Sequence, residues 1–280
     1  MGILPLPRAV DLPARRAIAY EVDVQGLTVQ IAACLALLPV AARVAGLLLV
    51  APVFGHQAVP VRLRLLMAAV IALAAMGMVA PPPAPTTVFQ LAATCATELA
   101  AGAAIGFAAG LIFTGVELAA VHVSAQMGIS LGEVSGGVAE EGGGPVVAAY
   151  RIMALAIFLV IGGHRDLLSA LMGTLEVAPV GALALKPAIL SAVVALLGAA
   201  FLLALKVAAP VLVALLLAAV AMGVLQRTLP QCHILSTGLP VRAMLGLLMM
   251  ALGVAVLAWA VESAWALTGR TLSDLVRTMV

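Results

Sequence analysis

Several ionisable residues lie inside strongly apolar stretches of the sequence: Arg43, Glu98, Glu117, His122 and Lys206. In a membrane segment, such groups are rare and usually face a protein partner or water rather than lipid. They could pass protons or hold a solute, as in a proton-coupled or small-solute secondary transporter. Alternatively, they could pair with each other or with neighbouring subunits to hold helices together. Because no two acidic residues share a close helical spacing, we favour the structural role.

Enzymatic chemistry has no local signature here. The sequence lacks H-E-x-x-H, G-x-S-x-G and G-x-x-x-x-G-K-[ST], which metalloproteases, hydrolases and phosphate-binding loops use. The glycine run at 142–144 does not suit an anion, because Glu140 and Glu141 would repel it and no lysine follows. The three cysteines have no C-x-x-C spacing. We therefore expect no catalytic residue, no cofactor and no metal ion.

The composition places the chain in a lipid bilayer. Hydrophobic residues make up 65% and charged residues 9%, with a mean hydropathy of +1.24, whereas soluble domains are roughly 45–50% apolar and about 25% charged. The formal net charge of +2 comes without any long basic cluster. We expect an all-α membrane protein that contacts lipid and does not bind nucleic acid.

Six apolar segments alternate with polar or proline-rich connections, and a proline-rich lead-in at 1–26 is expected to be poorly ordered or interfacial. The third segment has about 40 residues, which as one straight helix would span about 60 Å against a hydrocarbon core of about 30 Å. Simple crossings are therefore not expected. The stretch 162–187 predicts a partial helix and a turn, and 268–280 a polar tail. The segments are 27–53, 63–79, 88–127, 146–161, 188–222 and 241–267.

Prolines mark particular positions in these segments. Pro210 lies inside the fifth segment and predicts a kink there, because it cannot bond to the carbonyl of Lys206. Pro60 and Pro240 each precede an arginine by two residues, Arg62 and Arg242, and each is expected to open an apolar helix. A distant duplication or two independent helix starts would explain this echo, and we favour independent starts.

The stretch from Gln126 to Pro145 reads Q-M-G-I-S-L-G-E-V-S-G-G-V-A-E-E-G-G-G-P. Glycine costs about 1 kcal/mol relative to alanine in a helix, so this run predicts a flexible loop between two helices. The loop carries three acids, Glu133, Glu140 and Glu141, and no basic residue.

A row of small residues precedes that loop. Gly102, Gly106 and Gly110 recur every four residues, with Glu98 one step before the row and Glu117 beyond it. Small residues in such a row allow a second helix to approach closely in a membrane, although the spacing also arises by chance in an alanine-rich and glycine-rich chain. We take these residues as candidates for packing against another subunit.

Several connections, taken in order over about residues 40 to 250, resemble the R subunit of the flagellar export gate, FliR, and its injectisome homologue. The motifs include A-P-V-F at 51–54, V-P-V-R-L-R at 59–64, Q-M-G-I-S at 126–130, G-G-H at 162–164 and L-Q-R-T-L-P-Q at 225–231. The G-G-H and R-x-x-P-Q connections favour the flagellar branch over the injectisome branch. Candidate connection residues are Arg43, Pro60, Arg62, His164, Lys206, Pro210, Arg227, Pro230, Gln231 and Pro240.

The resemblance implies a structural subunit rather than an enzyme. In this family the R subunit joins P and Q subunits, with the B switch subunit as a further partner, in a helical cone that passes unfolded proteins across the bacterial inner membrane at the flagellar basal body. It implies one helical membrane domain at 27–267, made of a P-like part at about 27–185 and a Q-like part at about 188–267, with bent helical hairpins.

In the family, the segment after the Q-M-G motif reaches into the pore and helps to plug it, which implies a plug at 128–145 here. This loop lacks the bulky aromatic residues and the aspartate-proline pair that are usual in the family. That departure places side-chain sealing by this subunit in question. The candidate plug residues are Gln126, Met127, Gly128, Ile129, Ser130, Leu131, Glu133, Glu140, Glu141 and Pro145.

Overall fold

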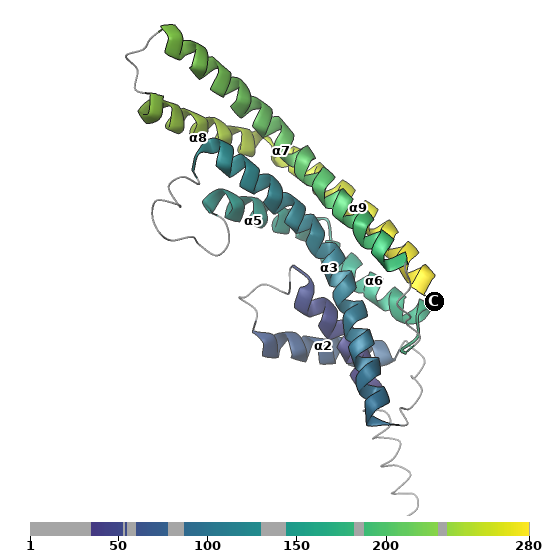
Figure 1. The fold of residues 1–280 in the computed structure, drawn as a ribbon. Coiled ribbons are helices and arrows are strands. Elements are labelled where there is room, and N and C mark those ends of the chain that lie inside the picture. Colours follow the sequence, from purple (N-terminus) through teal and green to yellow (C-terminus); the bar gives the residue numbers. More distant parts are fainter. Residues whose placement is uncertain are drawn as a thin grey trace, which may run out of the picture.

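The computed structural model describes residues 35–52, 54, 60–77, 87–129, 144–181, 188–228 and 234–279. These residues form helices and short turns, with no strand among them (Figure 1). The all-α prediction is confirmed. The helices are Leu35–Val50, α2 (Val61–Met76), α3 (Val88–Met127), α5 (Pro145–Val160), α6 (Gly163–Val177), α7 (Ala188–Thr228), α8 (Ile234–Leu252) and α9 (Val254–Met279).

Two of these helices are long and apolar enough to cross a membrane alone. They are α3, with a mean hydropathy of 1.9, and the part of α7 at Ser191–Leu225, with 2.6. Two further pairs of helices are long and apolar enough to cross a membrane only when each pair is taken as one span. Both are bent, α5 with α6 by 63° and α8 with α9 by 55°. By length and composition the described residues therefore offer two to four crossings, fewer than the six apolar segments.

Helix α3 is the axis on which two hydrophobic cores are built. Its residues 105–111 pack with the helix Leu35–Val50, α2 and α6, whereas its residues 112–127 pack with α5, α7 and α9. In Figure 1, α3 runs between α2 on one side and α7 and α9 on the other. The second core mixes residues from both predicted parts, 27–185 and 188–267, so the two cores do not follow that division, which stays a prediction.

Glycines set the bends between the paired helices. Gly162 adopts a left-handed conformation (φ 79°) that ends α5, and α6 starts at the next residue. A side chain on Gly163 would overlap the Phe158 ring, so the bend also needs glycine there. The stretch predicted as a partial helix and a turn is thus a helix of 15 residues followed by a turn through Gly181. The predicted 241–267 segment is divided at Gly253 into α8 and α9, which meet at a bend of 55°.

The predictions from proline succeed at one position and fail at another. Pro60 is the residue before the first turn of α2, as expected for a helix start. Pro240 lies inside α8, which begins at Ile234, so the prediction that it opens a helix is wrong. Pro240 is exposed six residues after the start of α8, whereas Pro60 precedes α2, so the two prolines have no common structural setting. Helix α7 continues through Pro210 over 41 residues.

The C-terminal segment does not leave the helical body as a tail. Helix α9 runs to Met279 and therefore includes 268–279. At the other end of the chain, the lead-in at 1–26 lies outside the described residues.

Candidate functional site

The first part of the candidate site is the joint between the helix Leu35–Val50 and α3. A side chain on Gly102 would overlap the carbonyl oxygen of Arg43, and one on Gly46 would overlap that of Leu99. A Cβ on Gly106 would lie 2.9 Å from the carbonyl oxygen of Leu47. The two backbones therefore touch, and only glycine fits at the crossing.

The small-residue row is used within the chain at two of its three positions. Gly102 and Gly106 face the helix Leu35–Val50, whereas a Cβ on Gly110 would have nothing within 4 Å. The proposed packing of this row against another subunit is untested and stays a prediction.

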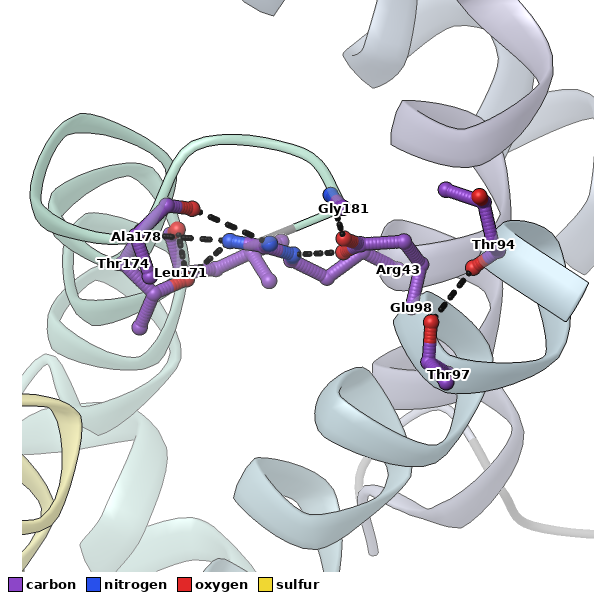
Figure 2. Close-up of polar contacts among 8 residues, drawn as sticks. All are labelled: Arg43, Thr94, Thr97, Glu98, Leu171, Thr174, Ala178 and Gly181. Atoms are coloured by element: carbon purple, nitrogen blue, oxygen red, sulfur yellow. Dashed lines mark hydrogen bonds and ion pairs between the residues drawn. The ribbon is translucent and has the colours of Figure 1, made fainter. Parts of the chain in front are cut away.

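Arg43 and Glu98 form an ion pair at this joint, and both side chains are fully buried (Figure 2). The Nε of Arg43 donates to Oε2 of Glu98. Its Nη1 donates to the carbonyl oxygen of Thr174 at 3.0 Å, and its Nη2 to that of Ala178 at 3.1 Å. The backbone N–H of Gly181 donates to Oε1 of Glu98 at 2.9 Å. We call these five residues the Arg43 cluster.

The chemistry of the Arg43 cluster suits an arginine. Its guanidinium offers five N–H donors in a fixed plane, enough for one carboxylate and two carbonyl oxygens. Those oxygens belong to the last turn of α6 and the residue after it, where the helix dipole favours a positive charge. The cluster therefore connects the helix Leu35–Val50, α3 and the end of α6 through a buried guanidinium.

A second ion pair joins α3 to α5. Nε of Arg151 lies 2.6 Å from Oε1 of Glu117, and each side chain keeps about a third of its surface exposed. The pair lines an open pocket of about 270 Å³, whose other walls are Leu49, Val50, Pro52, Phe113 and Leu155.

The remaining ionisable groups lie elsewhere. The ammonium of Lys206 lies 5.4 Å from the centre of the Trp259 ring, which joins α7 to α9. His122 bonds through Nδ1 to the carbonyl oxygen of Leu118 in its own helix, at 2.8 Å.

These groups do not converge on one path. Glu98 and Glu117 are 19 residues apart on α3, which is roughly 28 Å at 1.5 Å per residue. Among the described residues, no three His, Cys, Asp or Glu side chains are grouped so as to hold a metal ion.

The C-terminal end of α3 is the second part of the candidate site. Met127 is buried, and Gly128 ends the helix in a left-handed conformation (φ 77°), with its N–H donating to the carbonyl oxygen of Ala125 at 3.2 Å. Pro145 is the first residue of α5, and the next two valines are buried in the same core as Met127. The residues on both sides of the segment 130–143 thus belong to one core.

Some of the predicted plug residues lie at these two helix ends, next to the segment 130–143. Gln126 and Pro145 are exposed, and Ile129 is half-buried against the core. Five further predicted plug residues, Ser130, Leu131, Glu133, Glu140 and Glu141, lie outside the described residues.

Most of the predicted connection residues are spread over several helices. Arg62 is exposed on α2 and Arg227 is exposed near the end of α7. His164 is half-buried in the first turn of α6. Pro230 and Gln231 lie outside the described part of the chain.

Sequence reasoning missed several residues of the site. Arg151 could have been found, because it is a lone basic residue in an otherwise apolar segment. The carbonyls of Thr174 and Ala178 gave no signal, since every residue carries one. Gly46 is one small residue in a stretch rich in alanine and glycine, and only the fold reveals that its position meets the backbone of Leu99.

Comparisons with known proteins agree on one family. The family described as "Bacterial export proteins, family 1" matches residues 34–268. The chain is 30% identical over 213 residues to the flagellar biosynthetic protein FliR of Escherichia coli, covering 75% of this chain and 80% of the relative. It is 24% identical over 240 residues to FliR of Bacillus subtilis, covering 84% and 92%. FliR of Caulobacter vibrioides is 27% identical over 214 residues, covering 75% and 85%.

Proposed function

Because the chain belongs to the bacterial export proteins, family 1, we propose that it is a non-enzymatic channel subunit of a flagellar-type protein export gate. In this role it passes unfolded proteins across the bacterial inner membrane. The observation that carries the proposal is the family match over residues 34–268, which includes both cores and the glycine-rich loop. The relatives' shared name, flagellar biosynthetic protein, supports the flagellar branch.

The partners of this subunit are the P and Q subunits of the gate and its B switch subunit, at the flagellar basal body. Large apolar side chains on the outer surface of the chain are compatible with such an assembly, in which neighbouring subunits and lipid cover them. They lie on α2, α7 and α8, and they include Leu66, Val70, Leu73, Phe201, Leu205, Leu217, Met244, Leu248 and Leu252.

Within this subunit, the segment 128–145 acts as the pore plug. The helices on either side of it, α3 and α5, pack together in one core, so its two ends are held close to each other. Its glycines allow the chain to move aside for a substrate. Its three glutamates suit a water-filled lumen rather than lipid.

Removal of the chain from its host tests the export role. We expect flagellar proteins to stay inside the cell and to reach the medium again when the intact chain is restored. Secretion that persists without the chain, together with loss of uptake of a small solute, would instead favour the secondary-transporter reading.

Deletion of residues 132–142 tests the plug role while keeping Gly144 and Pro145 at the start of α5. We expect a resting gate with this deletion to leak ions or small molecules across the membrane. A control of equal length, with 132–142 replaced by glycine and serine, shows whether the bulk of the chain or its side chains matter. An unchanged membrane conductance after the deletion would contradict the plug role.

A further inference from the structure

Helix α8 contacts the C-terminal end of α3 at two points. Gly246 faces the side chain of Met127, and Leu239 faces Gly128. Leu239 and Gly246 are seven residues apart, which places them on one face of α8, two turns from each other. That face therefore lies along the last turn of α3 and the residue that ends it.

Gly246 forms a socket for Met127. A Cβ at position 246 would lie 2.5 Å from Cγ, 2.6 Å from Sδ and 2.8 Å from Cε of Met127, whose side chain is 1% exposed. Methionine is flexible, and a contact with its tip alone would be relieved by a small rotation. Here the overlap reaches Cγ, and buried residues surround the side chain. Any side chain at 246 must push Met127 out of its position.

The second contact covers the residue at which α3 ends. Gly128 has a φ of 77°, a conformation that favours glycine, and the Leu239 side-chain carbons lie 3.3 to 3.7 Å from where its Cβ would be. This conformation sets the direction in which the chain leaves α3. The Leu239 side chain thus fills the space beside Gly128, so α8 supports the end of the helix as well as its last side chain.

We propose that α8 clamps the end of α3, with Gly246 as the socket for Met127 and Leu239 over Gly128, and thereby sets the direction in which the chain leaves α3 at Ile129. The clamp itself follows from contacts between described residues. Its effect on the gate rests on the plug role proposed above for 128–145.

Hydrogen exchange in the assembled, membrane-extracted gate tests the clamp. In Gly246→Ala we expect the backbone amides of 124–129 to exchange at least about tenfold faster than in the unaltered protein, because the last turn of α3 loses its support. The double variant Met127→Ala/Gly246→Ala restores room in the socket and should return most of the protection. Gly223→Ala is the matched control, since a Cβ there has nothing within 4 Å.

A milder variant keeps the test informative if Gly246→Ala does not accumulate. Leu239 is partly exposed, so Leu239→Ala should leave the fold intact while uncovering Gly128. We expect faster exchange of the amides at 128 and 129 in this variant. Exchange at the rate of the unaltered protein in both single variants, or in Leu239→Ala alone if Gly246→Ala is not recovered, would overturn the clamp.

Membrane leakage, measured on the same variants, separates the clamp from the plug. Faster exchange together with a leak supports both proposals. Faster exchange without a leak supports the clamp and counts against the plug role of 128–145. Unchanged exchange overturns the clamp, whatever the leak.

Discussion

The side chain of Arg43 connects three segments of the chain: the helix Leu35–Val50 that carries it, α3, and the end of α6. It bonds to Glu98 on α3 and to two carbonyls at the end of α6, all away from water. A buried ion pair is expensive to desolvate, so its presence alone is weak support for stability, but removal of one partner leaves the other charge stranded. The pair therefore fixes the relative positions of three segments.

Arg43→Ala should destabilise the protein by about 3–5 kcal/mol, because it strands the buried carboxylate of Glu98. The double variant Arg43→Ala/Glu98→Ala should lose less than the single one. Arg43→Lys should give an intermediate result, since one ammonium cannot match the planar fork of the guanidinium. Unfolding of the assembled gate in detergent measures these effects. A double variant less stable than the single variant would contradict the stranded-charge argument.

Loss of the ion pair between Glu117 and Arg151 should cost less stability than loss of the pair between Arg43 and Glu98, although both join an arginine Nε to a glutamate carboxylate. Each side chain is about a third exposed, so solvent screens the interaction. We expect Glu117→Gln to cost at most about 1 kcal/mol in the same unfolding assay. A loss as large as that of Arg43→Ala would show that the surroundings of the pair are drier in the assembled gate than in the chain alone.

At the scale of elements, α3 depends on glycine only where another backbone crosses it. Gly102→Ala should separate α3 from the helix Leu35–Val50 and lower both stability and abundance in the membrane, because the new Cβ would overlap the carbonyl of Arg43. Gly110→Ala, on the same helix, should be neutral or stabilise by up to about 1 kcal/mol, since alanine favours the helix and the site is open. Equal effects of the two substitutions would contradict the crossing.

The sequence predicted the helices better than their ends and contacts. The apolar segments follow from composition, and Pro60 marked a helix start that the structure contains. The prediction from Pro240 was wrong, because α8 begins six residues earlier and contains this proline. The Arg43 cluster joins residues 55 and 131 positions apart, partly through backbone carbonyls, and no periodicity reports such a contact.

At the scale of the whole molecule, the two long helices differ in how much of their apolar surface the chain itself covers. Of an 18-residue apolar stretch of α3, 56% is buried by the rest of the chain, whereas only 22% of such a stretch of α7 is buried. Helix α3 therefore behaves as an internal axis. Helix α7 presents a long apolar face, with Phe201, Leu205 and Leu217 among its exposed residues, to lipid or to neighbouring subunits.

The exposed face of α7 predicts how the protein behaves when purified. Expressed alone and extracted in mild detergent, the chain should aggregate or unfold at lower temperature than when it is co-expressed with the P and Q subunits, because only partners of matching shape pack closely against this face. Size-exclusion chromatography and thermal unfolding measure both states. Phe201→Ala/Leu205→Ala should weaken co-purification, whereas Gly198→Ala, at an open site on the same helix, should not. A stable monomer, equally stable with and without its partners, would contradict an obligate shared assembly.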